Sequence, residues 1–211
     1  SGIFRENTVN LVGNGVVLDP IIFKDEIEKI RKISPEALKH LYISKKAHLI
    51  LPSHKMIDAA SEAAKGKTKI GSTLKGIGPT YMDKTGRNGL RVGDILSDNF
   101  KEKYEFLKSK HYQLLKQYDI EAPVIENEKE WFEGIECLKE FKLVDGEYEI
   151  NDALNSGKRI LAEGAQGTLL DIEYGSYPYV TSSNTVSSGA CTGLGVAPGK
   201  IGKVYGIFKS Y

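Results

Sequence analysis

Three cations beside a glycine-containing run are the clearest chemical signal in this sequence. Lys84, Arg87 and Arg91 follow the stretch 71–78, which contains three glycines, a serine and a threonine. Glycine lets a backbone approach a ligand closely, and arginine fits phosphate through two parallel hydrogen bonds. The segment therefore has the chemistry to handle an anion. A Gly-rich surface loop before a solvated basic helix start is the alternative, and spacing alone does not separate the two.

Two later segments also combine small residues with polar side chains. Gln166 lies between Gly164 and Gly167, which leave its amide free to face a ligand. An amide carries both a donor and an acceptor, so it can recognise a purine edge with a carbonyl and a ring nitrogen. Residues 180–195 are small and rich in hydroxyls, and such a stretch can form a backbone nest for an anion. A turn capped by Gln166 and a flexible linker over 180–195 are the alternatives.

Alternating strands and helices are expected to position these segments. Runs of β-branched and apolar residues predict strands, and Pro following an N-cap residue predicts a helix start. Strands are expected at 8–12, 16–18, 41–43, 48–51 and 159–162. Helices are expected after Asp19, from Ser53 to about Lys65, from Asp98 to before Pro123, around 131–141 and near 150. This order indicates an α/β fold whose ligand loops follow the strands.

Residues 98–157 differ from the rest because they are charged, helical in pattern and poor in glycine. Their apolar stripes could line a cofactor-binding site, but packing between helices is the expected use. We therefore predict three parts: an α/β core over 1–97, a helical subdomain over 98–157, and a second part of the α/β core over 158–211.

Composition excludes several classes of protein. The 29 basic and 28 acidic residues nearly cancel, which argues against nucleic-acid binding and leaves only local phosphate sites. No apolar run approaches the about 20 residues that span a bilayer, and the first residues do not resemble a signal peptide. The two cysteines, Cys137 and Cys191, suit a reducing compartment. A cytoplasmic protein without membrane contact is expected.

The four histidines, at positions 40, 48, 54 and 111, show no metal-ligand or triad spacing. Core or surface roles are therefore expected for them. We assign no catalytic residue and no metal ligand to this chain.

Several blocks of the sequence resemble the adenylosuccinate synthetase family. The segment 76–91 is similar to a signature of that family, and 161–171 and 177–185 resemble two further segments in the same order. The opening residues 1–7, followed by 12–18, are similar to it as well. The resemblance is weak over 98–157. It implies a mainly parallel, P-loop-NTPase-like α/β core with an inserted helical subdomain.

The resemblance also implies an activity and site residues. The family joins IMP to L-aspartate at the expense of GTP, with Mg²⁺, in AMP biosynthesis. By resemblance, Thr73 contacts the 5′-phosphate of IMP, and Arg87 is the arginine that one subunit of a homodimer supplies to the other. Gln166 is the IMP-binding glutamine near the base oxygen that becomes phosphorylated. Thr181 is the IMP-binding threonine.

The same resemblance implies that the chain is the middle of a longer enzyme. The family's glycine-rich phosphate loop and its arginine-rich loop have no counterpart in the 211 residues. We therefore expect part of the IMP site, little of the GTP, metal and aspartate sites, and no activity in the isolated chain. Lys75, Asn88 and the loop 190–195 depart from the family pattern, so their roles stay open. A non-catalytic nucleotide-binding module and a structural or dimerisation core are the alternatives.

Overall fold

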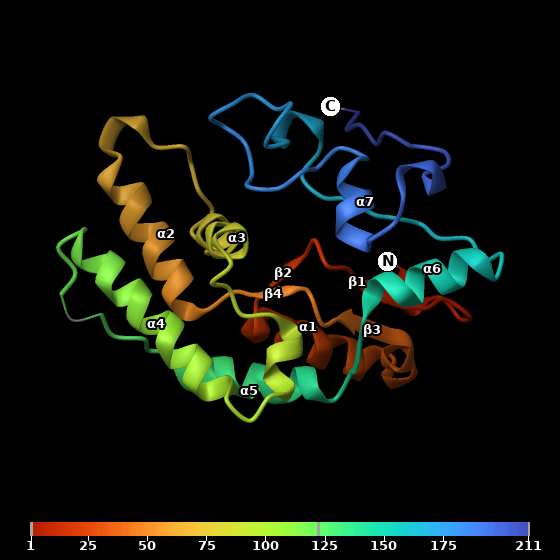
Figure 1. Ribbon diagram of the computed structural model, residues 1–211, viewed down its shortest axis with the longest axis horizontal. Coiled ribbons are helices and arrows are strands. Elements are labelled where there is room, and N and C mark those ends of the chain that lie inside the picture. The colour runs from red at the N-terminus through yellow and green to blue at the C-terminus, as the bar shows by residue number, and fades with distance from the viewer. Residues whose placement is uncertain (1, 122, 211) are drawn as a thin grey trace. The chain divides into compact units, whose positions relative to one another are not determined.

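The computed structural model describes residues 2–121 and 123–210, and it combines short strands with helices of varied length (Figure 1). The strands are β1 (Asn10–Val12), β2 (Val17–Leu18), β3 (Leu41–Ser44), β4 (His48–Leu49) and β5 (Lys142–Val144). The α-helices are α1 (Pro20–Ile33), α2 (Pro52–Ala64), α3 (Ile77–Gly86), α4 (Phe100–Lys116), α5 (Glu128–Lys139), α6 (Gly146–Asn155) and α7 (Gly189–Leu194). Short 3-10 helices are η1 (Gly2–Phe4), η2 (Pro35–His40), η3 (Gly66–Thr68), η4 (Val92–Leu96), η5 (Thr168–Leu170) and η6 (Pro198–Lys200).

The strands pair in parallel. One sheet has the order β1-β3-β5, with Leu11 opposite Tyr42 and Ile43 opposite Leu143. A second sheet joins β2 to β4, and its register places Val17 opposite His48. Parallel strands need crossover connections, and α1 supplies one after β2. The predicted α/β class with mainly parallel pairing is confirmed.

Local chemistry explains where α1 begins. The Asp19 side chain accepts a hydrogen bond from the Ile21 N–H (3.0 Å), and Pro20 occupies the first turn. Both features satisfy or remove backbone donors that a helix start leaves unpaired. The predicted start of this helix is confirmed.

Two other predicted helix starts are wrong. Leu51 is the N-cap of α2, and Ser53 lies inside the helix with its hydroxyl bonded to another side chain. Helix α4 begins at Phe100 after Asn99, so Asp98 is not the cap. Both predictions rested on residue type alone, but tertiary partners and the preceding turn decide which residue caps a helix.

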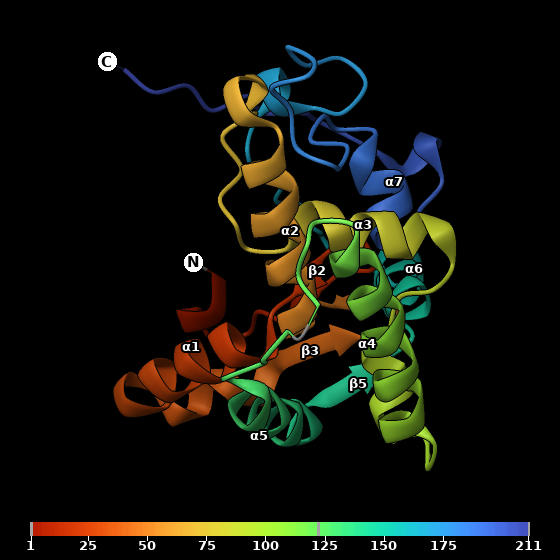
Figure 2. The same cartoon turned by 90° about the vertical axis from the view of Figure 1, so that its left-hand side faces the viewer.

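An apolar core occupies the first part of the chain. Helices α1 and α5 pack against each other, and Figure 2 shows them on one side of the strands with α2 and α3 on the other. Trp131 of α5 is almost fully buried, lies 4.8 Å from the Tyr104 ring, and donates its indole N–H to the Ile50 carbonyl (2.8 Å). Burial of this stripe confirms the packing role predicted for 131–141.

By its internal contacts the chain divides into two units, residues up to 146 and residues from 147 onward. The predicted boundaries at 97 and 157 stay a prediction. In the described part of the second unit, 147–210, no strand is formed, so the strand expected at 159–162 is wrong. Leu161 there is 85% exposed, and no neighbouring strand is present among the described residues to bury it.

None of the helices within 2–121 and 123–210 is long and apolar enough to cross a bilayer.

Candidate functional site

The signature segment 76–91 is largely helical, although glycine and proline residues usually mark turns. Helix α3 spans Ile77–Gly86, and both residues that flank it adopt left-handed backbone angles, with φ of 75° at Gly76 and 62° at Arg87. A Cβ at Gly76 would lie 2.9 Å from the Cβ of His54. Glycine is therefore required there both for its backbone angle and for the close packing of α3 on α2.

Lys84 and Arg87, two of the three cations in this segment, differ in burial and in hydrogen bonding. The Lys84 ammonium donates to the Asn14 carbonyl (3.1 Å) in the turn between β1 and β2. Burial lowers the pKa of Lys84, and the charge of Arg91 adds to the effect. Arg87 is exposed, and its guanidinium forms no ion pair with any residue in 2–121 or 123–210. Of these two cations, Arg87 is therefore the one that can meet a ligand without first breaking an internal bond.

His48 lies close to this positive charge. Burial, together with the nearby charges of Lys84 and Arg91, lowers the pKa of His48 to about 4. A Cβ at Gly89 would lie 2.8 Å from the His48 ring, so a glycine again allows close packing. His48 is thus neutral near pH 7 and adds no charge to the segment.

The loop before α3 carries Thr73. Thr73 is exposed, and its hydroxyl has no hydrogen-bond partner within the described residues. The neighbouring Ser72 hydroxyl donates to the Asp58 carboxylate (2.6 Å). Only one of the two adjacent hydroxyls is therefore open to a ligand.

A buried polar network ties α3 to α2 and α4. The Asp83 carboxylate of α3 accepts from Nε2 of His54 (2.9 Å) and Nε2 of His111 (2.7 Å). Because the carboxylate can only accept, Nε2 of His111 carries a proton, and Nδ1 of the same ring lies 2.7 Å from the Ser53 hydroxyl, within hydrogen-bond distance. Nδ1 of His54 accepts from the Leu51 N–H (2.9 Å). Every ring nitrogen in the network therefore has a partner.

Protonation states in this network follow from its surroundings. Burial lowers the pKa of His54 to about 4, although its hydrogen bond to Asp83 opposes the change. Burial also opposes ionisation of Asp83, but its hydrogen bonds from His111 and His54 outweigh that effect and hold its pKa well below its usual range. An ionised Asp83 carboxylate beside a neutral His54 imidazole is the state that these shifts support.

The same three side chains do not fit a metal ion. Their ligand atoms lie within 4.8 Å of one another. However, Nδ1 of His54 accepts a backbone hydrogen, so the proton of this neutral ring is on Nε2, where a metal would need a lone pair. Mg²⁺ in addition prefers oxygen ligands. His54 and His111 therefore serve the packing of three helices.

Gln166 and Thr181 lie in the second unit. Gln166 is exposed and has a left-handed backbone, with φ of 64°, followed by Gly167 at 99°. The Thr181 N–H donates to the Leu170 carbonyl (2.9 Å), and the Thr185 hydroxyl donates to the Gly167 carbonyl (2.7 Å). These bonds tie the glutamine segment and the threonine segment into one loop cluster.

Asp171 is the centre of that loop cluster. One carboxylate oxygen accepts from the N–H groups of Glu173 (2.9 Å) and Tyr174 (3.1 Å), and the other from those of Thr185 (2.6 Å) and Val186 (3.1 Å). Burial alone would raise the pKa of Asp171, but the four backbone bonds lower it to about 2. Asp171 belongs to a family-like motif, yet residue type gave no sign of this role.

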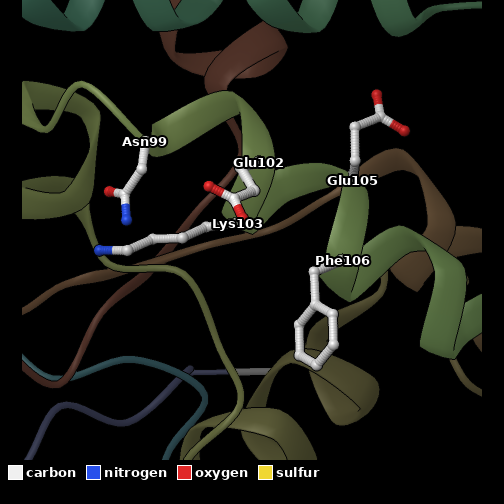
Figure 3. A pocket seen from close by; sticks show the side chains of 5 residues that line it. All are labelled: Asn99, Glu102, Lys103, Glu105 and Phe106. Carbon is white, nitrogen blue, oxygen red and sulfur yellow. The ribbon is translucent and has the colours of Figure 1, made fainter.

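A shallow hollow lies at the start of α4. It is lined by Asn99, Glu102, Lys103, Glu105 and Phe106. Figure 3 shows the Phe106 ring and the Glu105 carboxylate pointing in opposite directions. Lys103 is held by Asp94 (2.6 Å), so the hollow offers no converging set of free polar groups.

Comparison with known proteins decides the family. The family model described as adenylosuccinate synthetase matches residues 1–211. The chain belongs to the adenylosuccinate synthetase family. An adenylosuccinate synthetase of Bacteroides fragilis is 63% identical over 211 residues, and one of Flavobacterium psychrophilum is 60% identical over 213. Each alignment covers 100% of this chain and 50% of the relative, so the chain spans about half the length of the curated relatives it matches.

Two solved structures are similar to this chain. A fully ligated adenylosuccinate synthetase from Plasmodium falciparum matches with a TM-score of 0.83 and 35% identity, covering 95% of this chain and 47% of that one. A succinoaminodeoxyadenylate synthetase of cyanophage S-2L, at 22% identity, has a TM-score of 0.56 and covers 93% of this chain and 43% of that one. At that identity the cyanophage protein shows a shared fold alone.

Within the adenylosuccinate synthetase fold, the four residues expected at the IMP site fall in two pairs. Thr73 and Arg87 flank α3 in the first unit, and Gln166 and Thr181 share the loop cluster of the second. Three of the four, all but the half-buried Thr181, are exposed. The roles given to these residues stay predictions.

Proposed function

We propose that this chain provides part of the IMP site of an adenylosuccinate synthetase. That enzyme joins IMP to L-aspartate with GTP, giving adenylosuccinate, GDP and phosphate, in the biosynthesis of AMP. Family membership over the whole chain supports the proposal. The observation that carries it is that Thr73, Arg87 and Gln166 are exposed with polar groups uncommitted to the described residues.

Thr73 and Arg87 are proposed to bind the 5′-phosphate of IMP. A hydroxyl donates one hydrogen bond, and a guanidinium supplies charge with two parallel donors that match phosphate. In the proposal, Arg87 reaches the phosphate on the other subunit of a homodimer. IMP would then favour the dimer, because a ligand that bridges two subunits stabilises their association.

Gln166 and Thr181 are proposed to bind the remainder of IMP. The Gln166 amide can donate to the purine 6-oxygen and accept from the neighbouring ring N–H. Its left-handed backbone suits this role, since residues held in sparsely populated backbone regions gather at ligand sites. Thr181, tied by its own N–H to Leu170, would present its hydroxyl from a fixed backbone.

GTP, Mg²⁺ and L-aspartate belong to the proposal for the whole enzyme. Mg²⁺ would neutralise charge on the phosphoryl group as it moves from GTP to the 6-oxygen, which the aspartate amine then displaces. We assign no residue of this chain to hold these three groups. A cytoplasmic location is part of the same proposal.

Calorimetric titration with IMP tests the proposed half-site. We expect binding to the 211-residue chain and a loss of at least about tenfold in affinity in Gln166→Ala, the change that one lost buried hydrogen bond can produce. Gln113→Ala, an exposed glutamine on α4, is the matched control and should bind as the unchanged chain does. Thr181→Ala should weaken binding as well.

Inosine separates the two parts of the site. Arg87→Ala should weaken IMP and leave inosine, which lacks the phosphate, unaffected. Equal binding of IMP by Gln166→Ala and Gln113→Ala would contradict the assigned base contact. Absence of IMP binding in a chain that is folded by circular dichroism would overturn the proposal that these residues form a half-site by themselves.

A further inference from the structure

Two carboxylates of α2 hold the loop that carries Thr73. Asp58 and Glu62 lie one helical turn apart, and both are buried, at 8% and 6% exposure. One Glu62 oxygen accepts from the N–H groups of Gly71 (2.6 Å) and Ser72 (3.3 Å). Asp58 accepts from the Ser72 hydroxyl with one oxygen (2.6 Å) and from the Gly76 N–H with the other (2.9 Å).

The loop has a backbone shape that needs such support. Gly71, Leu74 and Gly76 all have left-handed φ angles, of 84°, 56° and 75°. For a bulky residue such as Leu74 this region is disfavoured by contacts of its own Cβ, so external bonds must hold the loop in place. The N–H groups of Gly71, Ser72 and Gly76 all donate to carboxylates, as backbone N–H groups do in loops that bind anions. In this chain the anions are its own carboxylates.

Both carboxylates are fully engaged. The second oxygen of Glu62 pairs with the Lys65 ammonium at 3.0 Å. Hydrogen bonds from the loop to Glu62 lower its pKa, led by the one from the Gly71 N–H, so it is ionised at neutral pH. A phosphate that approached the same N–H groups would meet two negative charges and would be repelled. The phosphate can instead accept a hydrogen bond from the Thr73 hydroxyl, which is exposed on the loop.

We propose that Asp58 and Glu62 are positioning residues for phosphate recognition. By occupying the N–H groups of Gly71, Ser72 and Gly76, they fix the loop in the form that presents Thr73 and deny those N–H groups to the ligand. The assignment of phosphate to Thr73 rests on the proposed function. The attachment of the loop to α2 by the Asp58 and Glu62 carboxylates, here called the tether, rests only on the contacts between α2 and the loop.

Conservative and non-conservative variants of Glu62 make different predictions. Glu62→Gln keeps the oxygen that accepts the two backbone hydrogens and loses only the ion pair with Lys65. Glu62→Ala loses both backbone bonds, and Asp58→Ala frees the Ser72 hydroxyl and the Gly76 N–H. Glu130→Ala, an exposed glutamate of α5, is the control for removing a carboxylate.

Amide hydrogen exchange by NMR reads the tether without any ligand. Exchange at Gly71 and Ser72 should quicken by about tenfold in Glu62→Ala, the change expected for the loss of a charge-assisted hydrogen bond, and stay near the original rate in Glu62→Gln. Asp58→Ala should have the same effect at Gly76. Unchanged exchange in both alanine variants, with α2 still protected, would overturn the tether.

Binding of IMP and inosine then tests the positioning role. Glu62→Ala and Asp58→Ala should weaken IMP by about tenfold and leave inosine unaffected, while Glu62→Gln binds IMP normally. A freed loop with undiminished IMP affinity would overturn the positioning role. If the unchanged chain binds no IMP, the proposed function fails, and the exchange rates alone decide for or against the tether.

Discussion

The two units of this chain are stabilised in different ways. In the first unit, one cluster of buried apolar side chains runs from Leu18 to Leu138 and joins strands to helices. In the second, only Asp171 and Val196 are buried within 147–210, and large residues such as Ile207 and Phe208 are almost fully exposed. The first unit is ordered by apolar burial, and the second by hydrogen bonds around one carboxylate.

The two units therefore show two sources of a fixed backbone geometry. An apolar core supplies most of the favourable free energy of folding, but the hydrophobic effect is non-directional and does not fix the orientation of individual groups. A carboxylate that accepts hydrogen bonds from four backbone N–H groups fixes the orientation of those groups while burying little surface. The pairs of candidate site residues sit in these two settings, so each should respond to a different kind of change.

Removal of the largest core side chain should have the largest effect. Trp131→Ala should lower the free energy of unfolding of the first unit by about 3–5 kcal/mol, because it leaves a cavity and removes the hydrogen bond to the Ile50 carbonyl. Urea unfolding followed by circular dichroism measures this. The control Phe106→Ala, at a 62% exposed position of α4, should change stability by less than about 0.5 kcal/mol. Similar losses in the two variants would contradict the core assignment.

Acid should affect the two units in different pH ranges. The folded pKa of His54 is about 4, below the ordinary value of 6.5, so the unfolded chain takes up this proton first as the pH falls. Stability from His54 is therefore complete above pH 6.5 and is lost toward pH 4, by about 3 kcal/mol for a shift of this size. Ionised Asp83 and the His111 ring are the groups that face it.

Asp171 should respond at lower pH. Its folded pKa is about 2 against an ordinary 3.8, so its contribution is complete above pH 3.8 and is lost as the pH falls toward 2. Amide exchange measured from pH 7 to the acid limit of folding should therefore show the first unit weakening before the loop cluster of the second. Loss of protection at Thr185 and Val186 before any in the first unit would refute this order.

The smallest effect on overall stability is expected from Asp171→Asn. The amide keeps one acceptor oxygen, but its NH₂ group faces two backbone donors, so one pair of bonds is lost. Exchange at that pair of amides should quicken by about tenfold or more, while protection in the first unit stays the same. Asp152→Asn, an exposed position in the same unit, is the control. Loss of protection in both units would show that their order is coupled.

Elements set by local chemistry could be predicted from the sequence. The start of α1 follows from Asp19 and Pro20, and the burial of α5 follows from apolar residues at helical spacing. Helix α3 was missed because glycine and proline usually mark turns. In the structure Pro79 falls in the first helical turn, where its missing N–H costs nothing.

The candidate site was predictable only in part. Motif resemblance identified Thr73, Arg87, Gln166 and Thr181. Residues that hold those positions gave weaker signals. Asp58 and Glu62 are four residues apart, so the helix predicted from Ser53 to about Lys65 places both carboxylates on one face, where the following loop could contact them. The histidines that meet Asp83 are 28 and 29 residues from it in sequence, and only tertiary packing brings them together.

Trp131 has a practical consequence. It is the single tryptophan of the chain, and its indole is buried in the first unit beside the Tyr104 ring. Selective excitation of indole therefore gives an emission that comes from the first unit alone, while exposed tyrosines such as Tyr177 and Tyr205 belong to the second. The chain carries an intrinsic fluorophore for one of its units, and that unit can be followed optically in the presence of the other without any added label.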